Sequence, residues 1–514
     1  MLGEEGTAVL QIHAASKLTR RRALQILAAV PMMPMLSGCG NGGSTSASPS
    51  VPAPGTQTEA ILGTAITIPY PLFGLNSGDN LAAFSSNTGF LSAVATLGPS
   101  ILRYPGGNSS SWFDLSTGEL LTNPTYPAVS SISSFASPPF TFSVLATLLA
   151  QSNASSTIVL NLLQGNMNSQ IAALQSANSI VPIERIELGN ELYLPGLNGL
   201  DQYQTAYPTA ANYVTTANAY ATAIKAIFPA VKIGASVVVD TPSSTRQTNW
   251  NPTLLSSMQN IDAIICHHYA DPPDPPFTGS SAASDNAALA AAGGPATVFS
   301  GALTARNTFQ AGAQAFPGYD VWVTETNFRD GVGGIAGTWA HGLYVAFMQL
   351  LLLEVPGIKQ AHIHALTSAT QEYAEVNEIS GTFPGSSITY QQNQLSASGY
   401  TSQFVFRAAR NNTSAQPITF SVNPTQTGSS GSTAPSLYGW TFGNNAACVL
   451  LNLSATTYST SFNGSSLFSG VAYQQLSDTP STYVGISAPA TTQGRFNAST
   501  GLSLPPYSIT YIGP

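Results

Sequence analysis

Residues 183–193 read Ile-Glu-Arg-Ile-Glu-Leu-Gly-Asn-Glu-Leu-Tyr, and this stretch decides the fold. Apolar and polar residues alternate up to Gly-Asn-Glu, which predicts a buried strand that delivers the carboxylate of Glu191 to its C-terminal end. Residues 320–328, Asp-Val-Trp-Val-Thr-Glu-Thr-Asn-Phe, repeat this design and present Glu325 in the same way. Two carboxylates at the ends of two strands indicate acid/base chemistry.

Strand-like segments alternate with helix-like segments over much of the chain, which predicts an α/β fold with a parallel sheet covered by helices. Eight such strands predict a (β/α)8 barrel. The helix-like segment 338–353 is apolar nearly all round, so we expect it to be buried against the barrel and a second domain. The predicted strands are 72–76, 100–104, 157–163, 183–189, 231–239, 261–267, 319–324 and 359–365.

Helical periodicity fades after about residue 370. Short strand-like runs separated by Gly, Asn and Ser turns then predict an antiparallel β-sandwich. The chain therefore divides into an export signal (1–39), a flexible Gly/Ser/Pro linker (40–58), the catalytic barrel (59–370) and the sandwich (371–514). An extended stretch at 59–70 can add a strand to the sandwich, so the two domains can be interleaved.

The N-terminus has the layout of an export signal. Lys17 and the arginines at 20–22 precede an apolar run at 23–36 that is too short to span a bilayer. Residues 19–24 resemble a twin-arginine signal, and Leu-Ser-Gly-Cys at 36–39 resembles the lipobox of bacterial lipoproteins. We expect export from a bacterial cytoplasm and a lipid anchor on Cys39, at the periplasm or cell surface. In the alternative, the signal is a plain secretory one and Cys39 is incidental.

Composition narrows the possible partners. Charged residues make up only 7% of the chain and the formal net charge is −8, which argues against a nucleic-acid partner. Phosphate-binding loops, dinucleotide fingerprints and a nucleophile elbow are absent from the sequence. His267 and His268 are adjacent on a strand and point to opposite faces, so they do not easily share one ion. We therefore predict no metal and no cofactor.

Barrel enzymes place their working residues at the C-terminal ends of strands, and both glutamates satisfy that rule. A retaining glycosidase needs two carboxyl groups ~5–5.5 Å apart, one as general acid/base and one as nucleophile. We predict Glu191 as acid/base and Glu325 as nucleophile. In the alternative, Glu191 caps a helix and Glu325 pairs with Arg329 at the surface. Glu184 and Glu187 are expected at the lower end of the barrel or at its surface.

Four more residues are candidates for the site. Arg103, at the end of the second strand, is a candidate cation that keeps Glu325 ionised, or else a structural ion-pair partner. Asn190 can bind the 2-hydroxyl of a sugar, and Tyr269 can donate a hydrogen bond to the nucleophile. Asn76 stands at the polar end of the first strand. These residue types would bind a carbohydrate substrate.

An ordered set of motifs in this chain resembles glycoside hydrolase family 79, over residues 60–514. The motifs are Arg-Tyr-Pro-Gly-Gly-Asn at 103–108, Leu-Gly-Asn-Glu at 188–191, His-His-Tyr at 267–269, Val-Thr-Glu-Thr-Asn at 323–327 and Leu-Pro-Pro-Tyr-Ser-Ile at 504–509. The resemblance implies a heparanase-like or β-glucuronidase enzyme with a (β/α)8 barrel and a C-terminal β-sandwich. By this likeness Glu191 is the acid/base, Glu325 is the nucleophile, and the enzyme trims plant or microbial polysaccharide or glycoconjugate.

The sequence departs from that family shortly after the nucleophile. Uronate-binding members carry a Tyr and glycines there, whereas this chain has Arg329, Asp330, Gly331 and Gly333. The glycines can offer backbone N–H groups, and Arg329 can bind a sugar carboxylate if it points inward. An ionised Asp330 would repel a uronate and favour a neutral sugar. Two alternatives therefore stay open: a β-glucosidase or β-xylosidase on the same scaffold, and a noncatalytic glycan-binding surface lipoprotein.

Overall fold

The computed structural model describes residues 55–77, 85–128, 132, 138–197, 199–270, 289, 293–330, 334–368, 373–383, 387–429, 431–463 and 466–514. All of these residues belong to one compact unit of the chain, Pro52–Pro514. The predicted export signal with Cys39, most of the predicted linker, and Gly331 and Gly333 lie outside the described residues. Within the described part of the chain, the model contains no helix of the length and apolarity that a membrane span needs.

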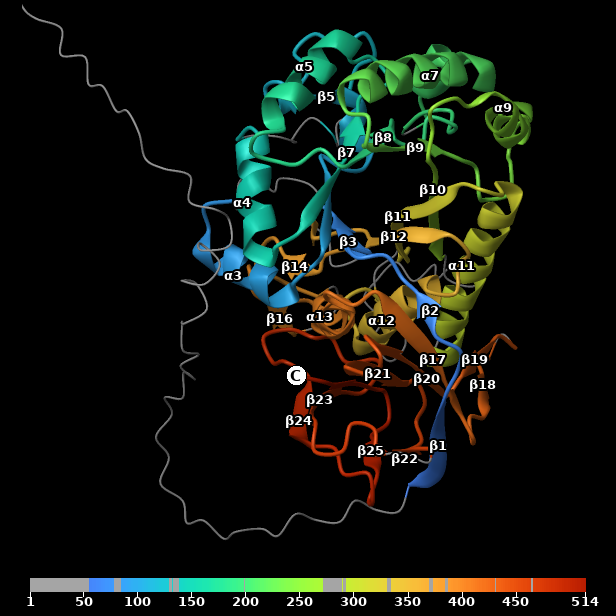
Figure 1. Ribbon diagram of the computed structural model, residues 1–514. Helices are drawn as coiled ribbons and strands as arrows, with labels where there is room; N and C mark the ends of the chain where they lie inside the picture. Colours follow the sequence, from blue (N-terminus) through green and yellow to red (C-terminus); the bar gives the residue numbers. More distant parts are fainter. Residues whose placement is uncertain are drawn as a thin grey trace, which may run out of the picture. The chain divides into compact units, whose positions relative to one another are not determined.

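A closed barrel of parallel strands forms the first half of the fold, as Figure 1 shows. Each strand pairs in parallel with its two neighbours, and all eight overlap the predicted strands. The predicted barrel is therefore confirmed. Its strands are β3 (Phe73–Asn76), β4 (Ile101–Tyr104), β7 (Ser155–Leu160), β8 (Arg185–Leu188), β9 (Lys232–Ser236), β10 (Ala263–Ala270), β11 (Asp320–Phe328) and β12 (Ile358–Ile363).

The helices between these strands lie outside the barrel (Figure 1). In α7, buried Tyr213, Ala217 and Ile224 recur at helical spacing, and a capping box between Thr209 and Asn212 satisfies its first N–H groups. The Tyr213 hydroxyl donates to the carbonyl of Leu188, which ties this helix to the end of β8. The helices are α3 (Thr88–Leu97), η1 (Asn108–Trp112), α4 (Phe142–Ser152), α5 (Met167–Ala177), α6 (Gln202–Ala206), α7 (Ala210–Ile227), α8 (Thr245–Thr248), α9 (Trp250–Ser257), α11 (Pro295–Ala315), α12 (Trp339–Leu352) and α13 (Ala397–Ala409).

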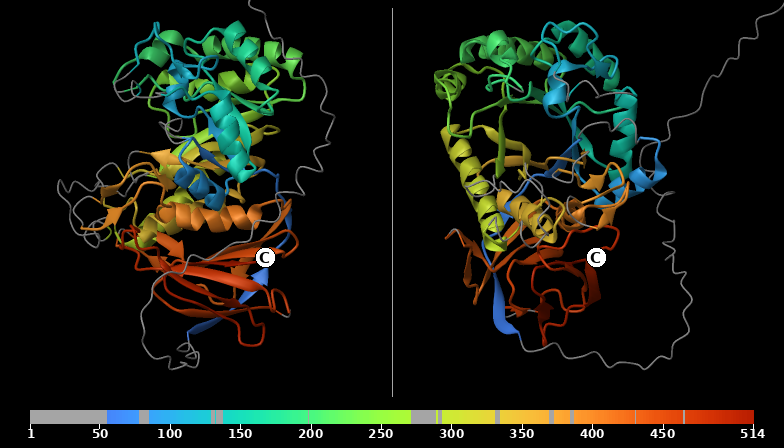
Figure 2. Two further views of the ribbon diagram at one scale, coloured as in Figure 1. Left: turned by 90° about the vertical axis from the view of Figure 1, so that its left-hand side faces the viewer. Right: turned by 180° about the vertical axis from the view of Figure 1, so that it is seen from behind.

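The second half of the fold is a mostly antiparallel β-sandwich, as predicted. Strand β1 (Thr56–Leu62), which precedes the barrel in sequence, pairs with β17 and β22 of this domain, and both views in Figure 2 show it in blue beside the red strands. The other strands are β2 (Ile66–Thr67), β17 (Ser414–Phe420), β20 (Leu437–Phe442), β21 (Ala447–Asn452), β22 (Tyr458–Phe462), β23 (Ala472–Ser477), β24 (Ala490–Arg495), β25 (Leu502–Leu504) and β26 (Ser508–Ile512).

Helix α12 is buried along its whole length, because it packs against barrel strands on one side and against sandwich strands and α13 on the other. Its first turn is tied to the sandwich domain, where the backbone N–H of Trp339 donates to Thr482 and its indole N–H to Tyr507. The apolar sequence of residues 338–353 predicted this buried helix. Short two-stranded sheets complete the fold: β5 (Phe113–Asp114) with β6 (Glu119–Leu120), β13 (Thr367–Ser368) with β14 (Val376–Asn377), β15 (Gly381–Thr382) with β16 (Thr389–Tyr390), and β18 (Thr425–Thr427) with β19 (Thr433–Pro435).

Candidate active site

Glu191 and Glu325 both lie at the C-terminal mouth of the barrel. Glu325 is a buried residue of β11, and Glu191 follows β8 by three residues. The backbone of Glu191 has φ +47°, in the left-handed region that costs a non-glycine residue about 1 kcal/mol or more. Its carboxylate is 16% exposed, against 6% for Glu325, so Glu191 is the more accessible of the two.

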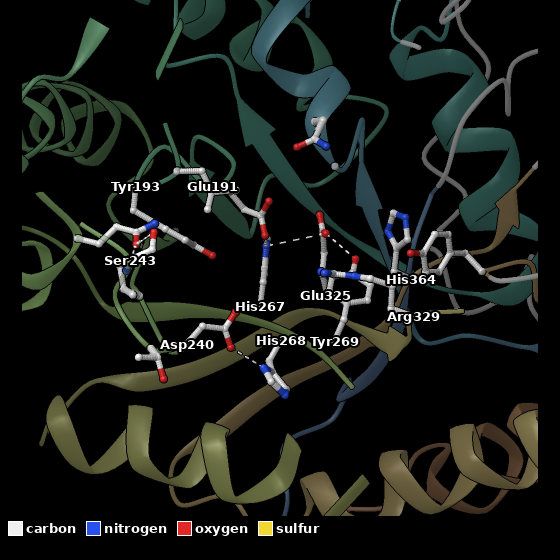
Figure 3. Close-up of a pocket in the computed structure, with 17 residues that line it drawn as sticks. Glu191, Tyr193, Asp240, Ser243, His267, His268, Tyr269, Glu325, Arg329 and His364 are labelled. Atoms are coloured by element: carbon white, nitrogen blue, oxygen red, sulfur yellow. Dashed lines mark hydrogen bonds and ion pairs between the residues drawn. The ribbon is translucent and has the colours of Figure 1, made fainter. Parts of the chain in front are cut away.

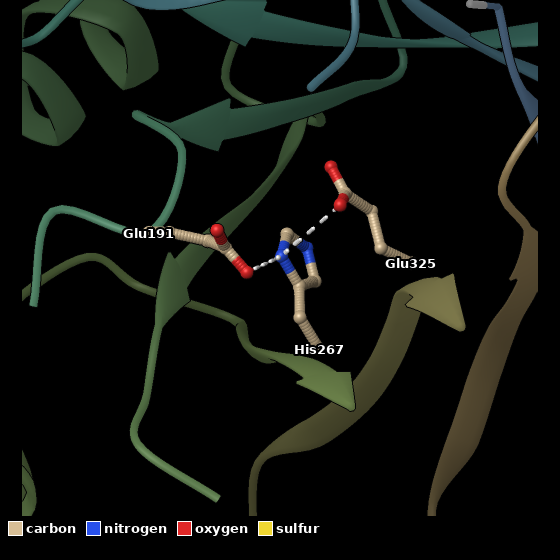
Figure 4. Close-up of side chains that lie close together, drawn as sticks. All are labelled: Glu191, His267 and Glu325. Carbon is tan, nitrogen blue, oxygen red and sulfur yellow. Dashed lines mark hydrogen bonds and ion pairs between the residues drawn. The ribbon is translucent and has the colours of Figure 1, made fainter. Parts of the chain in front are cut away.

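The two carboxylates are close enough for a retaining mechanism. One oxygen of Glu191, one oxygen of Glu325 and one ring nitrogen of His267 all lie within 4.8 Å of one another, and Figure 4 shows the imidazole between the two carboxylates. Retaining glycosidases hold their carboxyl groups ~5–5.5 Å apart, whereas inverting ones need ~6.5–9.5 Å for an intervening water. The geometry therefore matches the retaining class.

Glu325 is surrounded by hydrogen-bond donors. Its Oε1 accepts from Arg103 Nη1 at 2.5 Å and from Asn76 Nδ2 at 3.2 Å, and its Oε2 accepts from the Tyr269 hydroxyl at 2.8 Å. Burial alone would raise the pKa of Glu325, but the positive charges of His267 and Arg103 and the bond from Tyr269 outweigh it and hold the pKa well below its usual range. Glu325 is therefore ionised, as a nucleophile must be.

Arg103 is fully buried and joins two carboxylates. Besides its bond to Glu325, its Nε and Nη2 contact Glu187 Oε2 at 2.8 and 2.7 Å, and Nη2 also donates to Asn190 Oδ1 at 2.8 Å. The placement expected for Glu187 is wrong, because this side chain is fully buried inside the barrel; Glu184 does lie at the surface. A buried cation needs a buried anion beside it, and Glu187 supplies the second negative charge.

Among the described residues, the Glu191 carboxylate has one hydrogen-bond partner, His267. Its Oε1 lies 3.1 Å from His267 Nδ1, while His267 Nε2 lies 3.0 Å from Thr324 Oγ1. Burial lowers the pKa of His267, but the negative charges of Glu325 and Glu191 outweigh it, so the net shift is upward. The protonated form of His267 is thus stabilised by the carboxylates beside it.

Glu191, Glu325 and His267 line a cavity of about 420 Å³. Figure 3 shows the side chains around it. Most of its wall is polar. At its rim, His268 Nδ1 lies 2.5 Å from Asp240 Oδ1. The described lining residues are Gly107, Asn108, Glu191, Tyr193, Leu194, Val238, Asp240, Thr241, Ser243, Gln247, His267, His268, Tyr269, Glu325, Arg329, His364 and Tyr373.

No protein family model and no curated protein sequence matches this chain, whereas many solved structures do. A family 51 α-L-arabinofuranosidase from Bifidobacterium longum matches with a TM-score of 0.63 at 16% identity, over 89% of this chain and 99% of that one. The family 51 arabinofuranosidase from Xanthomonas axonopodis pv. citri gives 0.63 at 15%, with the same coverage. A 4-O-α-L-rhamnosyl-β-D-glucuronidase from Fusarium oxysporum gives 0.57 at 15%, over 89% and 100%.

The chain has the fold of a glycoside hydrolase. At these identities the likeness concerns the fold alone, and it does not single out family 79, so that assignment stays a prediction. The glycoside hydrolase fold agrees with the position of the two glutamates, which the sequence placed at barrel strands four and seven.

The residues predicted to bind substrate fall into two groups. Tyr269 and Arg329 line the cavity, with the guanidinium of Arg329 5.5 Å from the centre of the Tyr269 ring. The other three, Asn76, Arg103 and Asn190, are fully buried and do not line the cavity. They donate hydrogen bonds to residues that do: the first two to Glu325, and the third to Asn108.

Asp330 requires a correction. Its side chain is buried and does not line the cavity, because its Oδ2 accepts hydrogen bonds from the backbone N–H groups of Ile335 at 2.8 Å and Ala336 at 2.7 Å. The carboxylate thus stabilises the turn that leads into α12. Asp330 therefore does not face a sugar in the cavity, and the geometry does not support the expected repulsion of a uronate.

The sequence-based prediction missed several residues that line the cavity. His364 directly follows β12 and Asp240 lies four residues after the end of β9, so the strand-end rule could have found them. Tyr193 lies two residues after Glu191, and Tyr373 lies in an irregular segment that carries no local signal.

The loop that carries Glu191 is fastened by one cation, Arg246. Its guanidinium donates to the carbonyls of Leu192 at 2.5 Å, Tyr193 at 2.5 Å and Tyr207 at 2.7 Å, and it lies 4.8 Å from the ring centre of Trp250. Burial lowers the pKa of Arg246 to about 10, which leaves it charged at neutral pH. Because Leu192 and Tyr193 follow Glu191 directly, Arg246 fixes the position of that carboxylate.

Proposed function

We propose that this protein is a retaining glycosidase that hydrolyses O-glycosidic bonds by double displacement. The observation that carries this proposal is the approach of Glu191 and Glu325 to within 4.8 Å, with different hydrogen-bond partners around each carboxylate. Glu325 is stabilised as a carboxylate by a cation and two further donors. Glu191 contacts a proton-bearing imidazole and is accessible from the cavity.

In the first step, a Glu325 oxygen attacks the anomeric carbon of the sugar. The bond from that carbon to the leaving-group oxygen breaks, and the oxygen takes a proton from Glu191. This leaves a covalent glycosyl ester on Glu325 and an ionised Glu191. In the second step, Glu191 removes a proton from a water molecule as that water attacks the anomeric carbon, which releases the sugar and regenerates the Glu325 carboxylate.

For the sugar itself we propose a β-glucuronide. The motifs at residues 103–108, 188–191, 267–269 and 323–327 support it. Arg329 lines the cavity beside Tyr269, where a guanidinium can bind a sugar carboxylate bidentately. The Asp330 carboxylate accepts hydrogen bonds from Ile335 and Ala336, so it does not face that anion.

A second candidate substrate is an α-L-arabinofuranoside. It is favoured by the likeness to two arabinofuranosidases, whose TM-scores of 0.63 exceed the 0.57 of the glucuronidase. Neutral β-glucosides and β-xylosides belong in the same comparison, because the cavity is lined by many neutral polar groups as well as by Arg329.

The test is turnover of aryl β-glucuronide, β-glucoside, β-xyloside and α-L-arabinofuranoside by the unmodified protein, Glu325→Gln and Glu191→Gln. Glu119→Gln, which changes an exposed glutamate of β6, is the matched control. We expect cleavage of the glucuronide with retention of anomeric configuration, a loss of turnover by a factor of at least ~10² in both Glu325→Gln and Glu191→Gln, and unchanged turnover in Glu119→Gln. Cleavage of another glycoside would reassign the sugar. Sugar binding without any turnover would establish the noncatalytic alternative.

We also propose export and lipid anchoring through the segment 17–39, on its sequence pattern alone. Expression with Cys39→Ser should release the protein from the membrane fraction of a bacterial host. An unchanged distribution would leave Cys39 without a role in attachment.

A further inference from the structure

The cavity has two chemically different halves, which Figure 3 shows on either side of the two glutamates. Around the barrel mouth, Glu191 follows β8 and Glu325 belongs to β11, with β9 and β10 between them. Arg329 and His364 lie beyond Glu325. On the side of Glu191, the wall consists of the loop after β8 and the segment after β9, including Tyr193, Asp240, Thr241, Ser243 and Gln247.

The reaction assigns a role to each half, and this step rests on the function proposed above. The nucleophile must face the anomeric carbon, while the acid must face the oxygen that leaves. The sugar ring therefore lies against Glu325, and the leaving group lies on the side of Glu191. The half that contains Tyr193, Asp240 and Ser243 is the leaving-group half.

Asp240 gives the leaving-group half a negative charge. Its carboxylate is 60% exposed, and Oδ1 is held by Nδ1 of His268, which orients the group at the cavity wall. Among the described residues that line this half there is no Lys or Arg, whereas Arg329 lines the other half. Ser243 is oriented by Gln247, which accepts from both its backbone N–H and its hydroxyl.

We propose that Asp240 selects the leaving group by charge, so that the natural leaving group is a neutral hydroxyl-rich sugar or an amino sugar, and not a uronate or a sulfated sugar. A carboxylate accepts hydrogen bonds from sugar hydroxyls and attracts an ammonium group, and it repels an anion. Because Asp240 is well exposed to solvent, the effect of its charge is modest, about threefold in rate for one unit of leaving-group charge.

The experiment uses three aryl glycosides of the sugar that the enzyme cleaves best. Their phenols carry an aminomethyl, a hydroxymethyl or a carboxymethyl group in the para position, so their charge differs while their leaving ability is similar. We measure kcat/KM at low ionic strength, where exposed charges are screened least. The ratio of kcat/KM between two substrates does not depend on the amount of folded enzyme, so partial misfolding of a variant cannot imitate the result.

For the unmodified protein we expect the order of kcat/KM to be cationic, then neutral, then anionic substrate. The cationic and anionic substrates should differ about tenfold, and this difference should become smaller in high salt. Asp240→Asn should abolish the order and Asp240→Glu should retain it. Asp478→Asn, which removes the same charge in the sandwich after β23, should also retain it. Hydrolysis without a charge preference, or a preference that persists in Asp240→Asn, would overturn this inference and leave the glycosidase function standing. No hydrolysis of any glycoside would overturn both.

Discussion

Nδ1 of His267 lies 3.1 Å from Oε1 of Glu191, the residue proposed as the general acid. Negative charge beside an imidazole stabilises its protonated form, so the imidazole keeps its proton to a higher pH. The upward shift in the pKa of His267, caused by Glu325 and Glu191 against the opposing effect of burial, acts in the same direction. In His267→Gln we expect the alkaline limb of the pH profile of kcat/KM to move to lower pH. An unmoved alkaline limb would show that the proton of His267 makes no contribution to it.

The left-handed backbone of Glu191 predicts a difference in stability between two inactive variants. Glycine adopts a positive φ without strain, whereas alanine keeps the strain of the parent residue. Glu191→Gly should therefore be about 1 kcal/mol more stable to unfolding than Glu191→Ala, although both lack the acid. Denaturant titration measures the two free energies. Equal stabilities would mean that the backbone of residue 191 is unstrained.

Arg246 predicts a defect that depends on the leaving group. Lysine keeps the charge but cannot hold the carbonyls of Leu192, Tyr193 and Tyr207 at once, so Glu191 should lose its alignment. With Arg246→Lys, kcat/KM should fall at least about tenfold for a poor leaving group, whose departure needs the proton. It should change little for a dinitrophenyl glycoside, whose departure does not. A fall of equal size for both substrates would indicate general damage to the fold.

Glu375 predicts a pH dependence of stability. It is fully buried beside Ser398 and Ser402 of α13, and burial raises its pKa to about 8, although the two hydroxyls offset part of the shift. An unfolded Glu titrates near ~4.3. Between these values the native state holds a proton that the unfolded state has lost, so the free energy of unfolding falls as pH rises, by up to about 1.4 kcal/mol per pH unit.

The variant Glu375→Gln has no such proton and should lose this slope. Unfolding in urea from pH 5 to pH 9 tests it, with Glu119→Gln as the exposed control. The curves of the parent protein and Glu375→Gln should converge toward pH 5 and separate toward pH 8. Parallel curves would show that the Glu375 carboxyl ionises normally in the folded protein.

The barrel and the strand-end position of both glutamates were predictable, because alternation and strand length are local properties of the sequence. Glu187 was not placed correctly. Its strand is too short for alternation to distinguish the barrel interior from its lower rim, and only the fold shows that Arg103 lies opposite. The position of the Asp330 side chain was not predictable for a similar reason. It accepts hydrogen bonds from backbone N–H groups of a turn, and such bonds have no sequence signature.

Strand β1 pairs with β17 and β22, whose residues follow it by more than 350 positions in the chain. During synthesis, β1 cannot pair until the whole barrel has been made, because both partner strands follow the barrel in the chain. Formation of the sandwich is therefore among the last events of folding, and long-range pairing of this kind is slow. Residues 371–514 expressed alone would lack an internal strand of their sheet and expose two unpaired edges. The carboxyl-terminal domain is thus a dependent part of the molecule, which cannot be separated or exchanged at a single cut.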